Sequence, residues 1–232
     1  MTSALSPDGS LRLVIFDCDG VLIDSEGTSC RIVAEVAREA GLTVSDDDAV
    51  ERFGGKALPE LRREIEQASG KSLSDDWAQV MKERFIAAFA QRVEVIDGTH
   101  DMLDAVEALG LPVRVGSNSS VAEMDTKFGA TGLQDRLAGR IHSAVDMNAP
   151  KPAPDVYLQA AAEEGLKPEN CVVLEDSDTG ARAAIVAGMA CVLLRPRSEP
   201  APAWPGLVRI EKLSEFPVLL ANVLAVQDQR RS

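Results

Sequence analysis

An apolar run that ends in two carboxylates constrains the fold of this chain more than any other feature. Residues 11–26 read LRLVIFDCDGVLIDSE, so Asp17 and Asp19 directly follow a run typical of a fully buried parallel strand. In an open α/β sheet, ligands bind beyond the carboxyl ends of the strands. Two acids this close are hard to keep ionised unless a cation neutralises them or one carries a proton. The segment therefore predicts either a turn capped by Asp and Gly or an active site.

Two further segments place polar groups after apolar runs or in a stiff backbone. Residues 113–120, VRVGSNSS, form a second strand-like run that ends in Ser117 and Asn118. These side chains either cap the next helix or offer donors to an anion at its N-terminus. Lys151 lies between prolines in the segment NAPKPAPD, which fixes the local backbone. The lysine is either a solvated surface side chain or one that the rigid backbone holds in a functional site.

A third strand-like run ends in a second acidic pair. Residues 171–180 read CVVLEDSDTG, so Glu175 and Asp176 end the run and a helix begins near Asp178. Acidic pairs also cap helices, but four such polar segments in one α/β chain favour a shared site.

Four motifs occur in order along the chain: DxDGV, a hydroxyl after a second strand, KPxPD and EDSxxG. Together they resemble the motifs of the haloacid dehalogenase superfamily, over about residues 11–194. The resemblance implies phosphoryl transfer through an aspartyl-phosphate. Asp17 would attack phosphorus, and Asp19 would protonate the leaving oxygen and later deprotonate water. That role favours a raised pKa at Asp19, which crowding by Asp17 would supply and a bound metal would oppose, so the sequence leaves the balance open.

The resemblance also implies a phosphate site and a Mg²⁺ site. It assigns the phosphoryl oxygens to three polar side chains: Ser117, Asn118 and Lys151. It assigns the metal to Asp17, the carbonyl of Asp19, and Asp176. Glu175 would bind the metal directly or hold one of its waters.

The order of helical and strand-like segments predicts the domain organisation. Helical spacing recurs over 25–40, 49–53, 58–68 and 75–92 with no strand between. Strands are then expected at 112–117, 140–144, 171–175 and 190–194, an edge strand at 207–210, and helices at 100–109, 120–129, 154–164, 179–187 and 216–226. This pattern predicts a doubly wound, Rossmann-like parallel sheet formed by residues 1–24 and 95–232, and an inserted α-helical cap domain at 25–94.

The second helical region of the predicted cap is basic in an otherwise acidic chain, with Arg52, Lys56, Arg62 and Arg63 close together in the sequence. A lid of this kind would keep water from the phosphorylated intermediate. The glycines of the segment FGGK, residues 53–56, predict a loop that brings Lys56 into the crevice beside an anionic substrate. The alternative is a group of solvated side chains.

Composition excludes several partners. The formal net charge of −13 argues against nucleic acid and anionic membranes as partners. No apolar stretch has the length of a membrane span, and no leader is recognisable before Leu11, so we expect a cytoplasmic protein. The expected partner is a small phosphorylated metabolite, and the oligomeric state stays open.

Three functions compete. A dehalogenase has no use for an acid at Asp19. A sugar-phosphate mutase of the β-phosphoglucomutase type would carry a histidine and an arginine where this chain has Ser29 and Leu58. A non-catalytic binding protein would leave Asp17, Asp19 and Lys151 unexplained. The sequence therefore predicts a Mg²⁺-dependent phosphatase, with a sugar or sugar-acid phosphate as its substrate, and keeps the mutase as the alternative.

Overall fold

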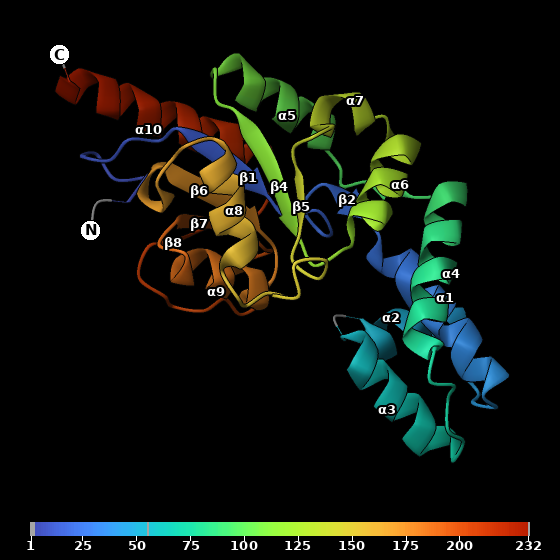
Figure 1. The fold of residues 1–232 in the computed structure, drawn as a ribbon. Coiled ribbons are helices and arrows are strands. Elements are labelled where there is room, and N and C mark those ends of the chain that lie inside the picture. Colours follow the sequence, from blue (N-terminus) through green and yellow to red (C-terminus); the bar gives the residue numbers. More distant parts are fainter. Residues whose placement is uncertain (1–2, 55, 232) are drawn as a thin grey trace.

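A six-stranded parallel sheet forms the centre of the molecule (Figure 1). The computed structural model describes residues 3–54 and 56–231. The strands of the sheet are β1 (Leu13–Phe16), β4 (Val113–Ser117), β5 (Ile141–Ser143), β6 (Cys171–Glu175), β7 (Ala190–Leu194) and β8 (Leu207–Ile210). Their spatial order is β5-β4-β1-β6-β7-β8, so the chain reverses its direction of winding at β1. This reversal creates the crevice where ligands bind in such sheets.

Helices cover both faces of the sheet (Figure 1). They are α5 (Thr99–Ala108), α6 (Val121–Thr131), α7 (Gln134–Leu137), α8 (Asp155–Glu163), α9 (Asp178–Val186) and α10 (Glu215–Arg231), with a 3₁₀ turn η1 (Pro168–Asn170). Because side chains alternate along a strand, β1 buries both of its faces. Leu13 and Ile15 belong to the core under α8 and α9, whereas Val14 and Phe16 belong to the core under α5, α6 and α10. This double burial explains the continuous apolar run.

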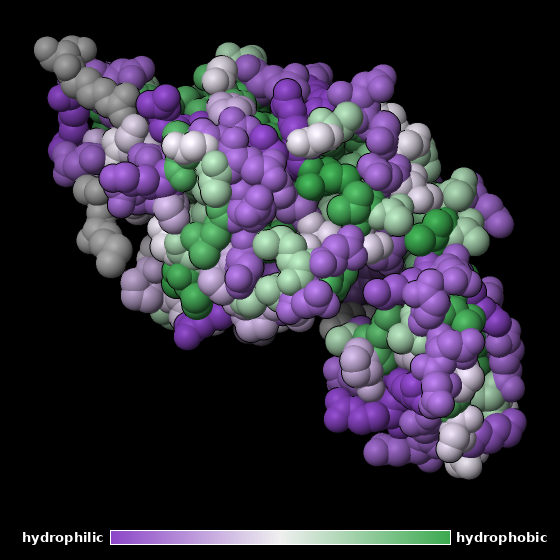
Figure 2. Space-filling view, in the orientation of Figure 1, coloured by the Kyte–Doolittle hydropathy of each residue, from purple (hydrophilic) through white to green (hydrophobic). Residues whose placement is uncertain are grey.

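Four helices, which we call the helical insert, lie between two short strands. They are α1 (Glu26–Glu39), α2 (Asp46–Phe53), α3 (Leu58–Ser69) and α4 (Trp77–Gln91), and the antiparallel strands β2 (Ile23–Asp24) and β3 (Glu94–Val95) flank them. The insert has a separate apolar core that includes Phe53, Ile65 and Met81. In Figure 2 it forms a lobe set off from the body of the molecule. The end of α4 packs against α6, and Phe89 of α4 belongs to the core of the main body.

The predicted fold class is confirmed, and the differences are local. Every predicted strand and helix occurs within a few residues of its expected bounds. Helix α2 begins at Asp46 rather than 49, because the Ser45 side chain accepts a hydrogen bond from the Asp48 N–H and three acids favour the helix N-terminus. Strands β2 and β3, helix α7 and the 3₁₀ turn are too short to give a periodic pattern.

The division into core and cap at 25 and 94 stays a prediction. Within 3–54 and 56–231, no helix has the length and apolarity needed to cross a membrane.

Candidate active site

Lys151 joins two buried carboxylates at the carboxyl ends of β1 and β6. Its Nζ donates to Asp17 Oδ1 at 2.6 Å and to Glu175 Oε1 at 2.7 Å. Asp17 directly follows β1 and Glu175 ends β6, and these two strands pair in parallel. Asp17 and Lys151 are each 7% exposed, and Glu175 is fully buried. The sequence motifs at 17, 151 and 175 therefore meet in one place.

Glu175 is held by donors on both of its oxygens. Tyr157 donates its hydroxyl to Oε1 at 2.6 Å, and the Ser177 hydroxyl donates to Oε2 at 3.0 Å. Although burial opposes it, Lys151 and these hydrogen bonds lower the pKa of Glu175. A Cβ at position 180 would lie 1.6 Å from Glu175 Oε1, so only glycine leaves room for this carboxylate.

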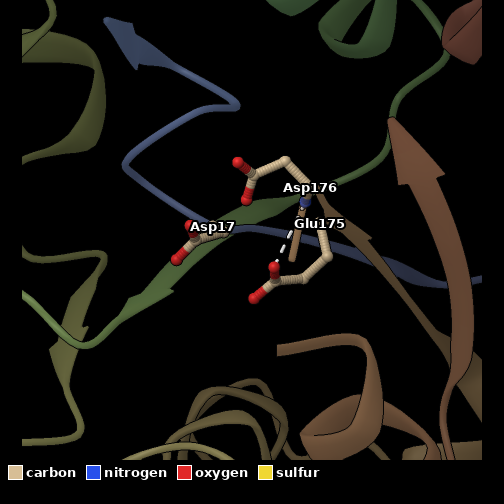
Figure 3. A group of neighbouring side chains, drawn as sticks. All are labelled: Asp17, Glu175 and Asp176. Carbon is tan, nitrogen blue, oxygen red and sulfur yellow. Dashed lines mark hydrogen bonds between the residues drawn. The ribbon is translucent and has the colours of Figure 1, made fainter. Parts of the chain in front are cut away.

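Asp17, Glu175 and Asp176 offer oxygen atoms that all lie within 4.8 Å of one another (Figure 3). Together with Lys151 we call them the acidic cluster. Gly20, with φ +80°, lies against this cluster, because a Cβ there would come 2.0 Å from Asp176 Oδ2. Burial, with Glu175 beside it, raises the pKa of Asp176 to about 7. Burial also raises the pKa of Asp17 well above its ordinary value, since Lys151 only partly offsets it.

The donor set of the acidic cluster suits a hard divalent cation. Three carboxylates share a single lysine, so negative charge remains that one ammonium group cannot neutralise. Carboxylate oxygens are the ligands that Mg²⁺ prefers in proteins. The residues present therefore fit a divalent metal.

Asp19 points to a different set of partners, which we call the Asp19 cluster: Lys127, Ser119 and Ser25. Lys127 Nζ donates to Asp19 Oδ1 at 2.6 Å, and Ser119 Oγ donates to Oδ2 at 2.7 Å. Ser25 Oγ donates to Oδ1 as well. Burial raises the pKa of Asp19, but the Lys127 charge and the three hydrogen bonds outweigh burial and lower it. The crowding that would raise the pKa of Asp19 is therefore outweighed in this arrangement, because a lysine neutralises the carboxylate.

Sequence reasoning missed all three partners of Asp19. One pattern could have revealed Lys127. It lies three residues after Met124 and one before Phe128, inside the apolar face of a helix, where a lysine is unusual unless it is paired. Ser25 and Ser119 carry no comparable signal, because serine is common at turns and helix starts.

The two predicted phosphate-loop residues lie beside these clusters. Ser117 ends β4, and its Oγ accepts a hydrogen bond from the Ser119 N–H at 3.0 Å. Asn118 Oδ1 accepts one from the Lys151 N–H at 2.9 Å. The structure thus links the loop after β4 to both lysines, and the role of these residues in phosphate binding stays a prediction.

Lys56 lies in an ion-pair group of the helical insert and not among the residues above. Its Nζ donates to Glu64 Oε2 and to the carbonyl oxygen of Arg52, both at 2.7 Å, and Arg52 Nε donates to Glu64 Oε1 at 3.0 Å. The neighbouring Gly55, which was expected to allow close approach of substrate, lies outside the described residues. A contact between Lys56 and a substrate remains a prediction.

Comparisons with known proteins agree on one family. A family model of haloacid dehalogenase-like hydrolases matches residues 11–188. The 6-phosphogluconate phosphatase of Escherichia coli K12 is 29% identical over 212 residues, 90% of this chain and 94% of that protein. The fructose-1-phosphate phosphatase YqaB of the same organism is 29% identical over 193 residues, 78% and 95% of the two chains. The crystal structure of a hydrolase of this family from Deinococcus radiodurans R1, with bound phosphate and sodium, is 31% identical with a TM-score of 0.73 and covers 93% of this chain and 97% of that one.

Proposed function

Because this chain belongs to the haloacid dehalogenase-like hydrolases, we propose that it is a Mg²⁺-dependent phosphatase of a small phosphorylated metabolite, a sugar or sugar-acid phosphate. The observation that carries the proposal is the acidic cluster, in which Asp17, Glu175 and Asp176 lie together at the strand ends and Lys151 pairs with the first two. The 6-phosphogluconate and fructose-1-phosphate phosphatases among the relatives support a phosphorylated sugar or sugar acid as the substrate. The cytoplasmic location stays a prediction.

In the proposed mechanism, Asp17 Oδ attacks phosphorus and the bond to the leaving oxygen breaks, which gives an aspartyl-phosphate. In its protonated form, which the pair with Lys127 disfavours, Asp19 gives its proton to the leaving oxygen and then takes one from the water that attacks phosphorus. This second step returns the Asp17 carboxylate and releases inorganic phosphate. The cluster geometry supports Asp17 as the nucleophile, because it lies at the strand ends beside the only buried ammonium group of the acidic cluster.

The polar residues around Asp17 bind the phosphoryl group and the metal. Lys151, Ser117 and Asn118 would donate to the phosphoryl oxygens, where charge develops during transfer. Mg²⁺, held by Asp17, Asp176 and the carbonyl of Asp19, would supply positive charge that lets an anionic nucleophile approach an anionic phosphate. Glu175 already accepts from Lys151, Tyr157 and Ser177, which supports a role in holding Lys151 over direct binding of the metal.

A sugar-phosphate mutase is the less favoured alternative. Such an enzyme must bind the second phosphate of its intermediate while the sugar turns round. Ser29 and Leu58 replace the histidine and arginine expected in that role. In the insert, Lys56 and Arg52 both pair with Glu64, so this group carries a single net positive charge with which to bind a second phosphate.

One assay separates these functions. A panel of sugar phosphates and sugar-acid phosphates, including 6-phosphogluconate and fructose 1-phosphate, is tested for phosphate release with Mg²⁺ and with excess chelator. Glucose 1-phosphate is tested in parallel for conversion to glucose 6-phosphate. We expect metal-dependent phosphate release and no isomerisation. Full activity in excess chelator would exclude the metal mechanism, and isomerisation without phosphate release would favour the mutase.

A further inference from the structure

We infer that Lys127 is a positioning residue for Asp19, and that it links the proposed acid and base of the reaction to the helical insert through Phe89. The inference rests on the proposed function, since it concerns the step in which Asp19 moves a proton. Lys127 lies in α6, outside all four sequence motifs, and the side chain is 3% exposed.

The hydrogen bonds of Lys127 lead to Asp19 directly and through Ser119. Its Nζ donates to Asp19 Oδ1 at 2.6 Å and to Ser119 Oγ at 2.9 Å, and Ser119 in turn donates to Asp19 Oδ2 at 2.7 Å. The three groups form a closed triangle of hydrogen bonds. A triangle of this kind fixes the plane of the carboxylate, because both of its oxygens are bound to groups that are bound to each other.

The ammonium group of Lys127 also contacts the helical insert. Lys127 Nζ lies 4.6 Å from the ring centroid of Phe89, on α4. This distance is within the range of a cation–π contact, and burial strengthens such contacts. Ser25, the residue before α1, also donates to Asp19. Both ends of the insert therefore touch the Asp19 cluster, one through a hydroxyl and the other through an aromatic ring.

The position of Lys127 in its helix indicates that the charge is needed to hold Asp19. Its neighbours Met124 and Phe128 are buried apolar residues of the main core. Burying an ammonium group there is costly unless it is paired, and an apolar side chain would satisfy the core at lower cost. What an apolar side chain cannot do is hold a carboxylate at a defined place.

Positioning matters most when the leaving group needs a proton. A poor leaving group such as an alkoxide requires Asp19 within hydrogen-bond reach of the ester oxygen, whereas a nitrophenolate departs almost without a proton. A displacement of about 1 Å can cost roughly a hundredfold in rate. Loss of Lys127 should therefore slow alkyl phosphates far more than activated aryl phosphates.

The test measures kcat and KM of wild type and Lys127→Met for β-glycerol phosphate, an alkyl ester, and p-nitrophenyl phosphate, an aryl ester, with Mg²⁺. We expect kcat to fall roughly ten- to a hundredfold for the alkyl ester and by less than about threefold for the aryl ester, with KM changed by less than about threefold. Lys127→Arg, which keeps the charge, should restore part of the alkyl activity. Lys212→Met, at an exposed lysine, serves as the control.

A double-mutant comparison separates positioning from a purely structural role. In an Asp19→Asn background, Lys127→Met should cause no further change in the ratio of alkyl to aryl activity, because the group that it positions is gone. Two outcomes would overturn the inference. One is an equal loss of activity on both esters, and the other is a Lys127→Met substitution that lowers the alkyl-to-aryl activity ratio as much in Asp19→Asn as in wild type. A wild type that releases no phosphate from either ester would instead contradict the proposed function, which is a different result.

The link to the insert has its own variant, which also covers the case in which Lys127→Met does not fold. Phe89→Leu keeps an apolar side chain but removes the ring, and we expect the same selective loss on the alkyl ester, about two- to fivefold. Phe85→Leu is the matched control, since this ring packs against Phe89 with centroids 6.2 Å apart but forms no contact with Lys127 among those described. Identical alkyl-to-aryl ratios for the two variants would contradict the link through Phe89.

Discussion

Asp17 and Asp19 each accept a hydrogen bond from a buried lysine at 2.6 Å, yet the structure shifts their pKa values in opposite directions. Asp17 shares Lys151 with Glu175 and lies close to Asp176, so burial and neighbouring negative charge raise its pKa. Asp19 has Lys127 and two hydroxyl donors for itself. The balance of charge in each cluster, and not the presence of a lysine, decides which carboxylate is stable as an anion. The acidic cluster therefore keeps negative charge that a cation could neutralise, whereas Lys127 already neutralises Asp19.

The largest expected effect comes from Asp17→Asn, because an amide cannot form the acyl-phosphate. Phosphate release should fall by roughly a thousandfold or more. The metal-free variant should be as stable as wild type or more so, because the substitution removes one negative charge from an acidic cluster that has too many. Steady-state phosphate release and denaturant unfolding test both points. More than about one hundredth of wild-type activity would exclude Asp17 as the nucleophile.

The next effect is a pH dependence of stability at Asp176. Its pKa is about 7 in the folded protein against an ordinary 3.8, so between these values the folded state binds more protons than the unfolded state. Stability of the metal-free protein should therefore fall as pH rises from about 4 to 7, and the full penalty should be present above 7.

Asp176→Asn removes this penalty. Without metal, the variant should be more stable than wild type at pH 8 by on the order of 2–4 kcal/mol, and similar to it at pH 4. Adding Mg²⁺ at pH 8 should raise the melting temperature of wild type more than that of the variant. Denaturant unfolding at both pH values, with and without Mg²⁺, provides the measurement. A variant that gains nothing between pH 4 and pH 8 would show that Asp176 is not strained by the charge around it.

Asp19→Asn should have the opposite effect on stability to Asp17→Asn. It leaves the buried Lys127 ammonium with neutral hydrogen-bond partners, so the free energy of unfolding should fall by about 1–3 kcal/mol at pH 7. Both variants replace an aspartate by asparagine, at positions two residues apart, so each serves as the control for the other. Equal changes in the midpoint of urea unfolding would remove the distinction between the two clusters.

The smallest expected effect lies in the helical insert. Lys56→Ala should lower kcat/KM for an anionic sugar-acid phosphate by about fivefold and leave p-nitrophenyl phosphate unchanged, since binding to a distal group alters discrimination between substrates. The effect is modest because Glu64 already accepts from Lys56. Arg63→Ala, on the same insert, is the control. A loss of the same size on both substrates would indicate a change in the closing of the insert and not a substrate contact.

The elements of the fold could be predicted from local patterns because each pattern reports burial. Strand β1 is apolar on both faces since helices cover both sides, and the helices show their spacing for the same reason. The short pair β2 and β3 could not be predicted, because two residues per strand give no period. The direction of the pKa shift at Asp19 could not be predicted, because the Asp17 carboxylate is visible nearby in the sequence and the lysine that lowers the pKa is not.

The sequence by itself indicated that Asp17 and Asp176 lie at one edge of the sheet, because each follows an apolar run typical of a buried parallel strand. Only the tertiary structure decided which lysine neutralises which aspartate. The two pairs join residues 134 and 108 positions apart, and such contacts depend on how α6 and the loop before α8 pack on the sheet. Local propensity fixes where a strand ends, whereas the charge that a strand end meets is set by packing between distant segments.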